Sequence, residues 1–153
     1  MRKKEREIKE RREIESVIHR SRVCRLAMSE GDCPYVVPLC FGYKDNALYF
    51  HTAMKGMKMD ILKKNSRVCF EFDLDHEMVT SPNPCDWGIK YRSVIGFGNA
   101  VLLEQSEPKK KALQIILEHY GAKGPFSYSE KGFRKTMIIK VGIESVTGKK
   151  AGY

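Results

Sequence analysis

The chain has 153 residues, of which 42% are hydrophobic, and this is enough apolar material for one folded domain with its own core. The sequence contains no apolar run of about 18 residues, the length needed to span a bilayer. Its five cysteines are dispersed and include no C-x-x-C pair, which argues against a zinc site or a disulfide framework. We therefore expect a soluble, cytoplasmic protein in a reducing compartment, with no membrane contact.

The formal net charge of +9 is concentrated near the start of the chain. Residues 1–12 carry seven basic and three acidic side chains, and they account for nearly half of the excess. Such a run is usually a solvated helix face, and less often an arm that contacts a partner. We predict a basic helical arm over residues 1–21 that packs on a single domain formed by residues 22–153.

The spacing of apolar residues predicts secondary structure along the whole chain. Alternating segments predict strands, and apolar residues that recur at i, i+3, i+4 and i+7 predict helices. In chain order, the expected elements are a helix over 10–20, strands over 22–28 and 35–43, a strand from Ala47 that runs into a helix ending near Asn65, a strand over 67–73, a polar loop over 74–86, a long strand over 87–104, a helix over 106–120 and a last strand over 136–146.

This order predicts a mainly β fold, an antiparallel sheet or barrel with helices on its outside, because turns and not helices join the first three strands. The strand over 87–104 is too long to lie flat, and Gly96 and Gly98 are the positions where it would bend. Pro38 interrupts the strand over 35–43. Since proline cannot donate to a ladder, it indicates an edge strand, a bulge or a ligand that lies against the backbone.

The junction at which the strand from Ala47 becomes a helix has the composition of a phosphate site. Thr52, Gly56 and Lys58 surround the start of that helix. Free backbone N–H groups and the positive end of the helix dipole favour an anion there. The alternative is a capped helix start with solvated lysines, and the junction taken alone fits this alternative better.

Other segments offer groups that could complete one site with this junction. Thr52 and Ser93 have hydroxyls, Lys58 has a mobile ammonium, and Arg92 has a planar guanidinium suited to phosphate or carboxylate. The apolar strand segment over 36–39 could carry a flat ring system. Together these groups suit a phosphorylated aromatic ligand.

The sequence offers little support for nucleophilic catalysis or for a metal site. It has no G-x-S-x-G elbow, and His51 has no evident acidic partner. The segment over 73–77 resembles a metal cluster, but we favour a charged loop and predict no metal site. Hydride or electron transfer through a bound cofactor needs no catalytic triad.

Several segments match a known family in consecutive order. Between about Arg22 and Val101 they are R-V-C-R-L-A-M, P-Y-V-V-P-L-C-F-G-Y, A-L-Y-F-H-T-A-x-x-G-x-K-x-D, N-x-R-V-C-F-E-F-D, C-D-W and Y-R-S-V-I-G-F-G-N-A. This pattern closely resembles the nitroimidazole-resistance (Nim) proteins. They belong to the FMN-binding split-barrel group, together with the pyridoxamine 5'-phosphate oxidases.

The resemblance implies a homodimer of six-stranded, antiparallel split β-barrels with FMN at the subunit interface. It implies that the phosphate and the ribityl chain are held by Thr52, Lys58, Arg92 and Ser93. The implied contacts of the isoalloxazine ring are Val36, Val37, Pro38 and Leu39, the backbone of His51, Thr52 and Ala53, and Trp87 at the interface.

One departure from this family pattern concerns the substrate. Pyridoxamine phosphate oxidases have an arginine beside the phosphate-binding lysine, where this chain has Met57. Their C-terminal substrate-binding Trp and Arg motif is also missing from the sequence. We therefore do not expect pyridoxamine phosphate to be the substrate, whereas FMN binding is still expected because Lys58 is present.

The leading hypothesis is an FMN-dependent oxidoreductase that passes reducing equivalents from an external donor to a small acceptor such as a nitroaromatic compound. Arg25 and His51 are the candidate catalytic residues on the substrate side. The alternatives are a protein that binds flavin or haem without turnover, and a deazaflavin in place of FMN. A nucleic-acid-binding module is a further alternative, because Gly96-Phe97-Gly98 partly matches an RNA-recognition strand, although Ile95 and Asn99 depart from that motif.

Overall fold

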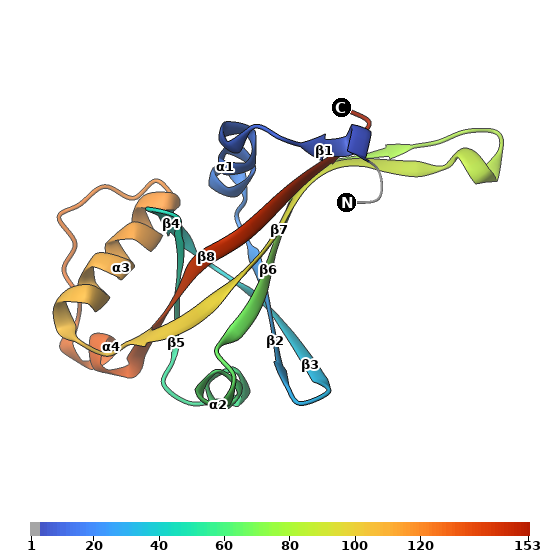
Figure 1. The fold of residues 1–153 in the computed structure, drawn as a ribbon. Coiled ribbons are helices and arrows are strands. Elements are labelled where there is room, and N and C mark those ends of the chain that lie inside the picture. The colour runs from blue at the N-terminus through green and yellow to red at the C-terminus, as the bar shows by residue number, and fades with distance from the viewer. Residues whose placement is uncertain (1–3) are drawn as a thin grey trace.

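One long antiparallel sheet, curled on itself, organises residues 4–153, the part of the chain that the computed structural model describes (Figure 1). The helices are α1 (Arg11–Arg20), α2 (Met57–Lys64), α3 (Ser106–His119) and α4 (Glu130–Lys135), with short 3-10 helices at Lys4–Arg6 and Pro84–Asp86. The strands are β1 (Glu7–Ile8), β2 (Cys24–Glu30), β3 (Cys33–Leu39), β4 (Gly42–Lys44), β5 (Ala47–Ala53), β6 (Arg67–Val79), β7 (Gly88–Leu103) and β8 (Thr136–Ala151).

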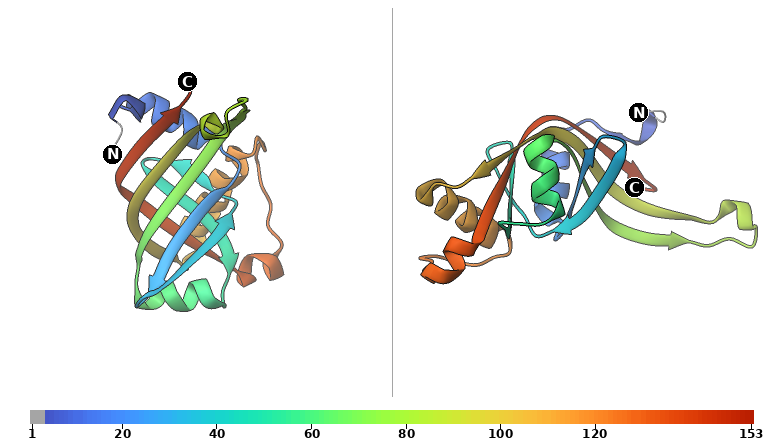
Figure 2. Two further views of the ribbon diagram at one scale, coloured as in Figure 1. Left: turned by 90° about the vertical axis from the view of Figure 1, so that its right-hand side faces the viewer. Right: turned by 90° about the horizontal axis from the view of Figure 1, so that it is seen from below.

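The sheet is an open barrel. Its strand order is β3-β2-β6-β7-β8-β5-β4, with β1 added beside β8, and every pairing is antiparallel. The two edges, β3 and β4, follow each other in the chain, yet no ladder joins them within residues 4–153. Figure 2 shows the resulting curvature. The predicted split-barrel class is confirmed, although the sheet has eight strands instead of six.

Alternate residues of the strands fill the inside of the barrel, and helices cover its ends and one outer face. Among the fully buried side chains are Phe41, Phe50, Phe70 and Phe72. Helices α1 and α2 lie at opposite ends of the barrel (Figure 1). Their buried side chains are Ile14, Val17, Ile18, Met59, Ile61 and Leu62. Helix α3 packs on the outer face of β5 and β8.

Strands β6 and β7 continue beyond the barrel as a two-stranded arm (Figure 1). The predicted polar loop over 74–86 is therefore wrong in its first half, because β6 continues to Val79 and pairs there with the start of β7. A bulge between Leu74 and Glu77, with Asp75 at φ 58°, lies where the ribbon leaves the barrel. Alternation is weak in this segment because both faces of the ribbon are largely exposed.

Other boundaries also differ from the prediction. The strand expected over 35–43 is divided at Phe41, whose ring is fully buried and whose backbone N–H donates to the Tyr120 hydroxyl (3.1 Å). Strand β8 continues to Ala151, beyond the expected end. Helix α4 lies in the expected loop and is too short to show a helical period. None of the helices between residues 4 and 153 has both the length and the apolar character needed to cross a bilayer.

The chain before β2 packs on the barrel in two places. Helix α1 contacts β6 and β7, and β1 pairs with β8, Ile8 lying opposite Gly148. Residues 1–3 of the predicted basic arm lie outside the described residues. A division of the chain at residue 21 remains a prediction.

Candidate functional site

Two free strand edges flank the opening of the barrel. Strand β3 pairs with β2 along its whole length and with no other strand in the described part of the chain, so Pro38 lies on an edge. Strand β5 pairs with β4 only from Ala47 to Tyr49, which leaves one backbone edge of residues 50–53 without a strand partner among residues 4–153. Unpaired backbone N–H and C=O groups of this kind can bind the polar rim of a flat ligand.

Helix α2 begins just after β5 ends, and its first turn is free to bind an anion. Gly56 is the N-cap residue, with φ 124° and no side-chain cap. Met59 and Asp60 both donate their backbone N–H groups to the Gly56 carbonyl (2.8 and 3.2 Å). Helix geometry therefore leaves the N–H groups of Met57 and Lys58 without a partner in the helix. The Lys58 side chain is partly exposed at the same turn.

Thr52 carries a buried polar atom that the protein does not satisfy. The residue is 6% exposed, and its Oγ1 has no hydrogen-bond partner among residues 4–153. A buried hydroxyl without a partner costs about 1–3 kcal/mol, and a native structure rarely keeps one without a reason. The position of Thr52, next to the open start of α2, fits a hydroxyl that binds a ligand.

The four ring-contacting residues predicted on β3 divide between the two faces of the sheet. Val36 and Pro38 are exposed on the outer face, where Pro38 lies opposite Arg25 of β2. Val37 and Leu39 pack against the core. Helix α2 crosses the lower end of the barrel (Figure 2): its last residues contact the end of β2, where Lys64 pairs with Glu30, and its start follows the end of β5.

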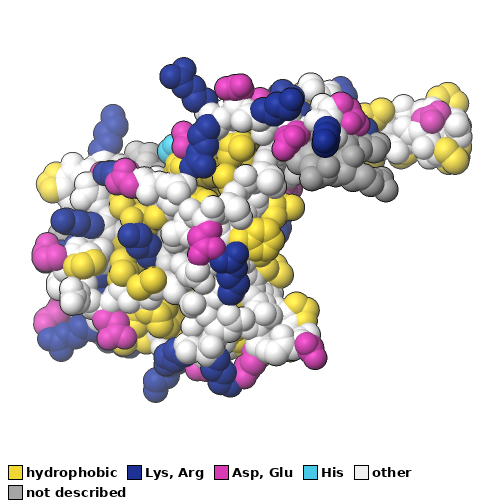
Figure 3. Space-filling model, viewed as in Figure 1, with side chains coloured by type: hydrophobic (Ala, Val, Ile, Leu, Met, Phe, Trp, Pro, Cys, Tyr) yellow, Lys and Arg dark blue, Asp and Glu magenta, His cyan; other side chains and the backbone are white. Residues whose placement is uncertain are grey.

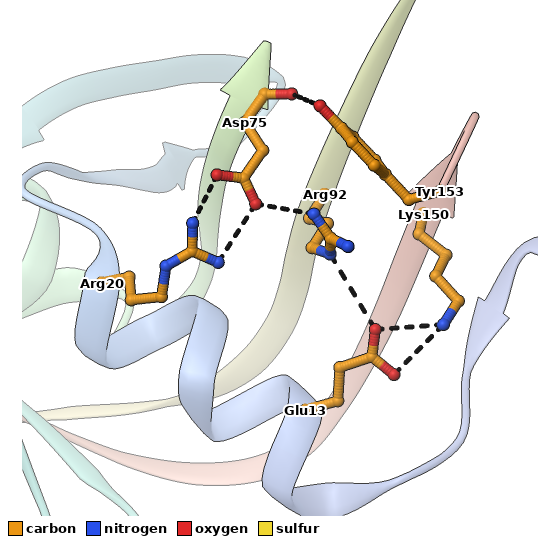
Figure 4. Close-up of polar contacts among 6 residues, drawn as sticks. All are labelled: Glu13, Arg20, Asp75, Arg92, Lys150 and Tyr153. Atoms are coloured by element: carbon orange, nitrogen blue, oxygen red, sulfur yellow. Dashed lines mark hydrogen bonds and ion pairs between the residues drawn. The ribbon is translucent and has the colours of Figure 1, made fainter.

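Arg92 is held by residues at the α1 end of the barrel (Figure 4). Its guanidinium donates to the Asp75 carboxylate (2.8 Å), and its central carbon lies 4.1 Å from the centre of the Tyr153 ring. Arg20 binds both oxygens of the same carboxylate. The hydrogen bonds from Arg20, and then those from Arg92, hold the pKa of Asp75 below its ordinary value. Glu13 of α1 also faces Arg92, at 4.0 Å.

The structure does not bring Arg92 and Lys58 together within one chain. Arg92 lies seven residues along β7 from Asn99, which pairs with the first residue of β6, just after α2. Seven strand residues span roughly 23 Å. Ser93 follows Arg92 at that distant end, and Trp87 lies farther out on the arm. Three of the predicted cofactor contacts are thus remote from the α2 start of their own chain.

The two candidate catalytic residues lie on different strands and in different surroundings. His51 is exposed on β5, opposite Ile138 of β8. Arg25 of β2 donates to Glu71 (3.0 Å) and to Asp73 on β6. Burial, followed by the charge of Asp73, raises the pKa of Glu71, and Arg25 opposes this. Arg25 therefore acts as the counter-ion of two carboxylates, and a catalytic role for either residue stays a prediction.

The acidic segment over 73–77 is divided by the bulge at Asp75. The Asp75 side chain turns toward two arginines (Figure 4), whereas Asp73 pairs with Arg25 and His76. No group of three or more metal-type side chains converges within residues 4–153. Strand alternation alone would place both aspartates on one face, so the sequence carried no signal for the Asp75 cluster.

Large hydrophobic side chains are exposed on the arm and on the outer face of the sheet, and Figure 3 shows both regions. On the arm, Met78 is 61% exposed and lies opposite Ile89 on the same face of the ribbon. Trp87 is 55% exposed near the tip. On the sheet, Phe97 of β7 is exposed beside Cys69 of β6. Exposed apolar side chains of this size are typical of interaction surfaces.

Comparison with known proteins shows the family to which this chain belongs. A family model described as pyridoxamine 5'-phosphate oxidase matches residues 10–150. The chain belongs to the pyridoxamine 5'-phosphate oxidase family. No match was found among curated proteins.

Several solved structures have a fold similar to that of this chain. A proposed 5-nitroimidazole antibiotic resistance protein from Bacteroides thetaiotaomicron is 34% identical, with a TM-score of 0.83 over 94% of this chain and 86% of that one. An FAD-binding protein from Mesorhizobium loti is 26% identical, with a TM-score of 0.69 over 96% of this chain and 98% of that one. The flavocytochrome Anf3 from Azotobacter vinelandii shares the fold, with 16% identity and a TM-score of 0.84 over 100% of this chain and 72% of that one.

Membership of the pyridoxamine 5'-phosphate oxidase family confirms the resemblance found in the sequence. Within one chain, the free edge of β5 leads directly to the α2 start, and this segment includes Thr52 and Lys58, while the free edge of β3 lies on the other side of the barrel opening. Arg92, Ser93 and Trp87 form a separate group on β7 and the arm.

Proposed function

We propose that the protein binds FMN in the opening of the split barrel and acts as an oxidoreductase on a small acceptor. The observation that carries this proposal is the unsatisfied, buried Thr52 hydroxyl beside the uncapped start of α2. A phosphate dianion would satisfy that hydroxyl and the free N–H groups together. When bound, the flavin supplies the electron and hydride chemistry, for which the protein offers no catalytic triad.

The chain's own groups fit the two ends of such a cofactor. Lys58 and the first-turn N–H groups of α2 would neutralise the phosphate, and Thr52 would hydrogen-bond to it. The free backbone edges of β3 and of residues 50–53 would meet the polar rim of the flavin ring. Val36 and Pro38 would add apolar contact at the outer side. The family and its flavin-binding relatives support this assignment.

The remaining predicted contacts require a second copy of the chain. Arg92, Ser93 and Trp87 are far from Lys58 in their own chain, so they would reach a cofactor only across a dimer interface. The exposed apolar face of the arm supports such an interface, because an isolated two-stranded ribbon is marginally stable in water. We therefore include homodimerisation in the proposal.

A nitroaromatic acceptor is the substrate class that we favour. The support is the 34% identity to the proposed 5-nitroimidazole resistance protein over nearly the whole chain. Pyridoxamine phosphate is not proposed, because Met57 stands where the oxidases have an arginine. His51 and Arg25 are the candidate groups on the substrate side.

A second candidate is a protein that binds a flavin or haem without turnover. The relatives motivate it, since one is an FAD-binding protein and another is a flavocytochrome. Both candidate functions need the same cofactor-binding site, so only catalytic turnover distinguishes them. Bound flavin would be reduced anaerobically with a nicotinamide donor, and its reoxidation by a nitroimidazole would be timed. Reoxidation no faster than that of free FMN would favour the binding protein.

Cofactor binding is tested by titrating the purified protein with FMN, FAD, a deazaflavin and haem. We expect FMN to bind with quenched fluorescence and shifted visible absorption, and to raise the melting temperature. If FMN produces none of these changes at saturating concentration, the proposed cofactor is wrong. A stronger response to another ligand of the series would transfer the assignment to that ligand.

The dimer is tested by sedimentation of the holoprotein. We expect a dimer that the double substitution Met78→Ser and Trp87→Ser dissociates. Val101→Ser is the matched control, because Val101 is also 56% exposed but lies on the barrel part of β7. A monomeric wild type, or equal dissociation by the control, would contradict the role given to the arm.

A further inference from the structure

A cavity is lined by residues at the start of α3, in α4 and at the start of β8. Figure 1 shows these three elements close together. The volume of the cavity is about 350 Å³, and Ser106, Lys109, Phe133 and Thr136 are among its lining residues. Met54, just after β5, lines another part of the wall. This volume falls at the lower end of the range for small-molecule sites.

Lys109 is the unusual residue of this cavity. It is 6% exposed, and its ammonium lies 4.4 Å from the centre of the Phe133 ring. No carboxylate within residues 4–153 forms an ion pair with it, whereas the adjacent Lys110 pairs with Glu107 (3.0 Å) at the surface. Most of the Lys109 side chain is therefore buried while its ammonium keeps some contact with solvent, so the ammonium can pair with an anion that enters the cavity, and the Phe133 ring face offsets part of its desolvation.

The backbone around Lys109 adds donors that suit an anion. Gln105, the N-cap residue of α3, makes no side-chain cap, and Lys109 donates its own N–H to the Gln105 carbonyl (3.1 Å). The N–H groups of Ser106 and Glu107 therefore have no partner in the helix, and Pro108 has no N–H group. The positive end of the α3 dipole points to the same place.

The other polar side chains that line the cavity indicate which further groups the ligand would carry. The Arg134 side chain borders the cavity but is paired with Glu130. Thr136 already donates its hydroxyl to the Gly132 carbonyl (2.9 Å), so its oxygen can only accept. Glu104 also borders the cavity and offers an acceptor for ligand hydroxyls. An anionic group near Lys109 with hydroxyls beyond it matches this arrangement.

We propose that this cavity binds a phosphate-bearing small molecule, with the phosphate group between the Lys109 ammonium and the first turn of α3. Inorganic phosphate and a nucleoside monophosphate share this chemistry. The proposal does not depend on FMN binding, since the groups that would hold the phosphate belong to α3, although Met54 of the cavity wall lies in the segment between Thr52 and Lys58.

The test uses the full chain in phosphate-free buffer, with and without saturating FMN. Inorganic phosphate and AMP are titrated separately, with calorimetry and the ³¹P linewidth as readouts. Lys109→Met removes the charge at similar length. Lys110→Met is the matched control, because Lys110 is the neighbouring lysine, is surface-exposed and lies outside the cavity.

We expect phosphate, AMP or both to bind the wild type, and Lys109→Met to weaken that binding by about tenfold or more. The control should bind as the wild type does. If only inorganic phosphate binds, the ligand of the cavity is the free anion. If only AMP binds, the ligand is a phosphate ester. Absence of binding by both probes, or equal binding by the two variants, would overturn the proposal. Release of FMN by AMP would also overturn it, because the cavity would then belong to the flavin site. The FMN titration tests the proposed function, and its result does not depend on whether phosphate or AMP binds to this cavity.

Discussion

Replacement of Thr52 by valine tests two effects of the buried hydroxyl: that it destabilises the apoprotein, and that it strengthens FMN binding. Valine has nearly the same shape but no polar atom, so Thr52→Val removes an oxygen that is buried without a partner among residues 4–153. The desolvation penalty of such a group is about 1–3 kcal/mol. We therefore expect the free energy of unfolding of the apoprotein to rise by about 1 kcal/mol or more. For a chain of this size, that corresponds to a melting temperature about 2–4 °C higher per kcal/mol.

The same substitution should weaken FMN binding. A hydrogen bond to a charged phosphate contributes about 1.5–3 kcal/mol, which corresponds to a loss of roughly 10- to 150-fold in affinity. Apoprotein melting and fluorescence titration with FMN measure the two effects on the same samples. Thr147→Val is the control, because Thr147 is exposed on β8 and should change neither quantity appreciably. A destabilised Thr52→Val apoprotein, or one with unchanged FMN affinity, would refute the role of this hydroxyl.

Two further predictions concern the barrel and the base of the arm. Gly98→Ala should destabilise the protein by several kcal/mol, because a Cβ there would lie 2.1 Å from the Gly142 carbonyl oxygen, whereas Gly142→Ala meets no atom within 4 Å and should be tolerated; equal urea midpoints would contradict this. The Asp75 pKa is lowered chiefly by Arg20, so its contribution to stability is full above the ordinary Asp value of about 3.9 and is lost as the pH falls through the lowered pKa. Acid titration of the unfolding free energy should therefore be flatter for Asp75→Asn, and not for Asp32→Asn in the β2–β3 turn.

The strands of the barrel could be predicted from sequence because one face of each is buried, and this produces alternation. The arm could not be predicted in this way. Residues Leu74–Val79 belong to a ribbon that is largely exposed on both faces, so their sequence resembles that of a polar loop. The junction at Thr52 and Lys58 could be located because it is local in sequence. The separation of Lys58 from Arg92 depends on strand register over the length of β7, which composition and spacing do not reveal.

The surroundings of Lys58 and Arg92 predict unequal roles in phosphate binding. Arg92 already binds Asp75 and stacks on Tyr153, so a phosphate that recruits it must displace a carboxylate, and the net gain is only the difference between two anions. Lys58 is partly exposed, so its attraction to a phosphate is not offset in this way. Lys58→Met should therefore weaken FMN binding by about tenfold, and Arg92→Met by less, with a loss of about 1–3 kcal/mol in unfolding free energy instead. FMN titration and urea unfolding of both variants measure this, and a larger affinity loss for Arg92→Met would mean that the Asp75 pair opens readily for the ligand.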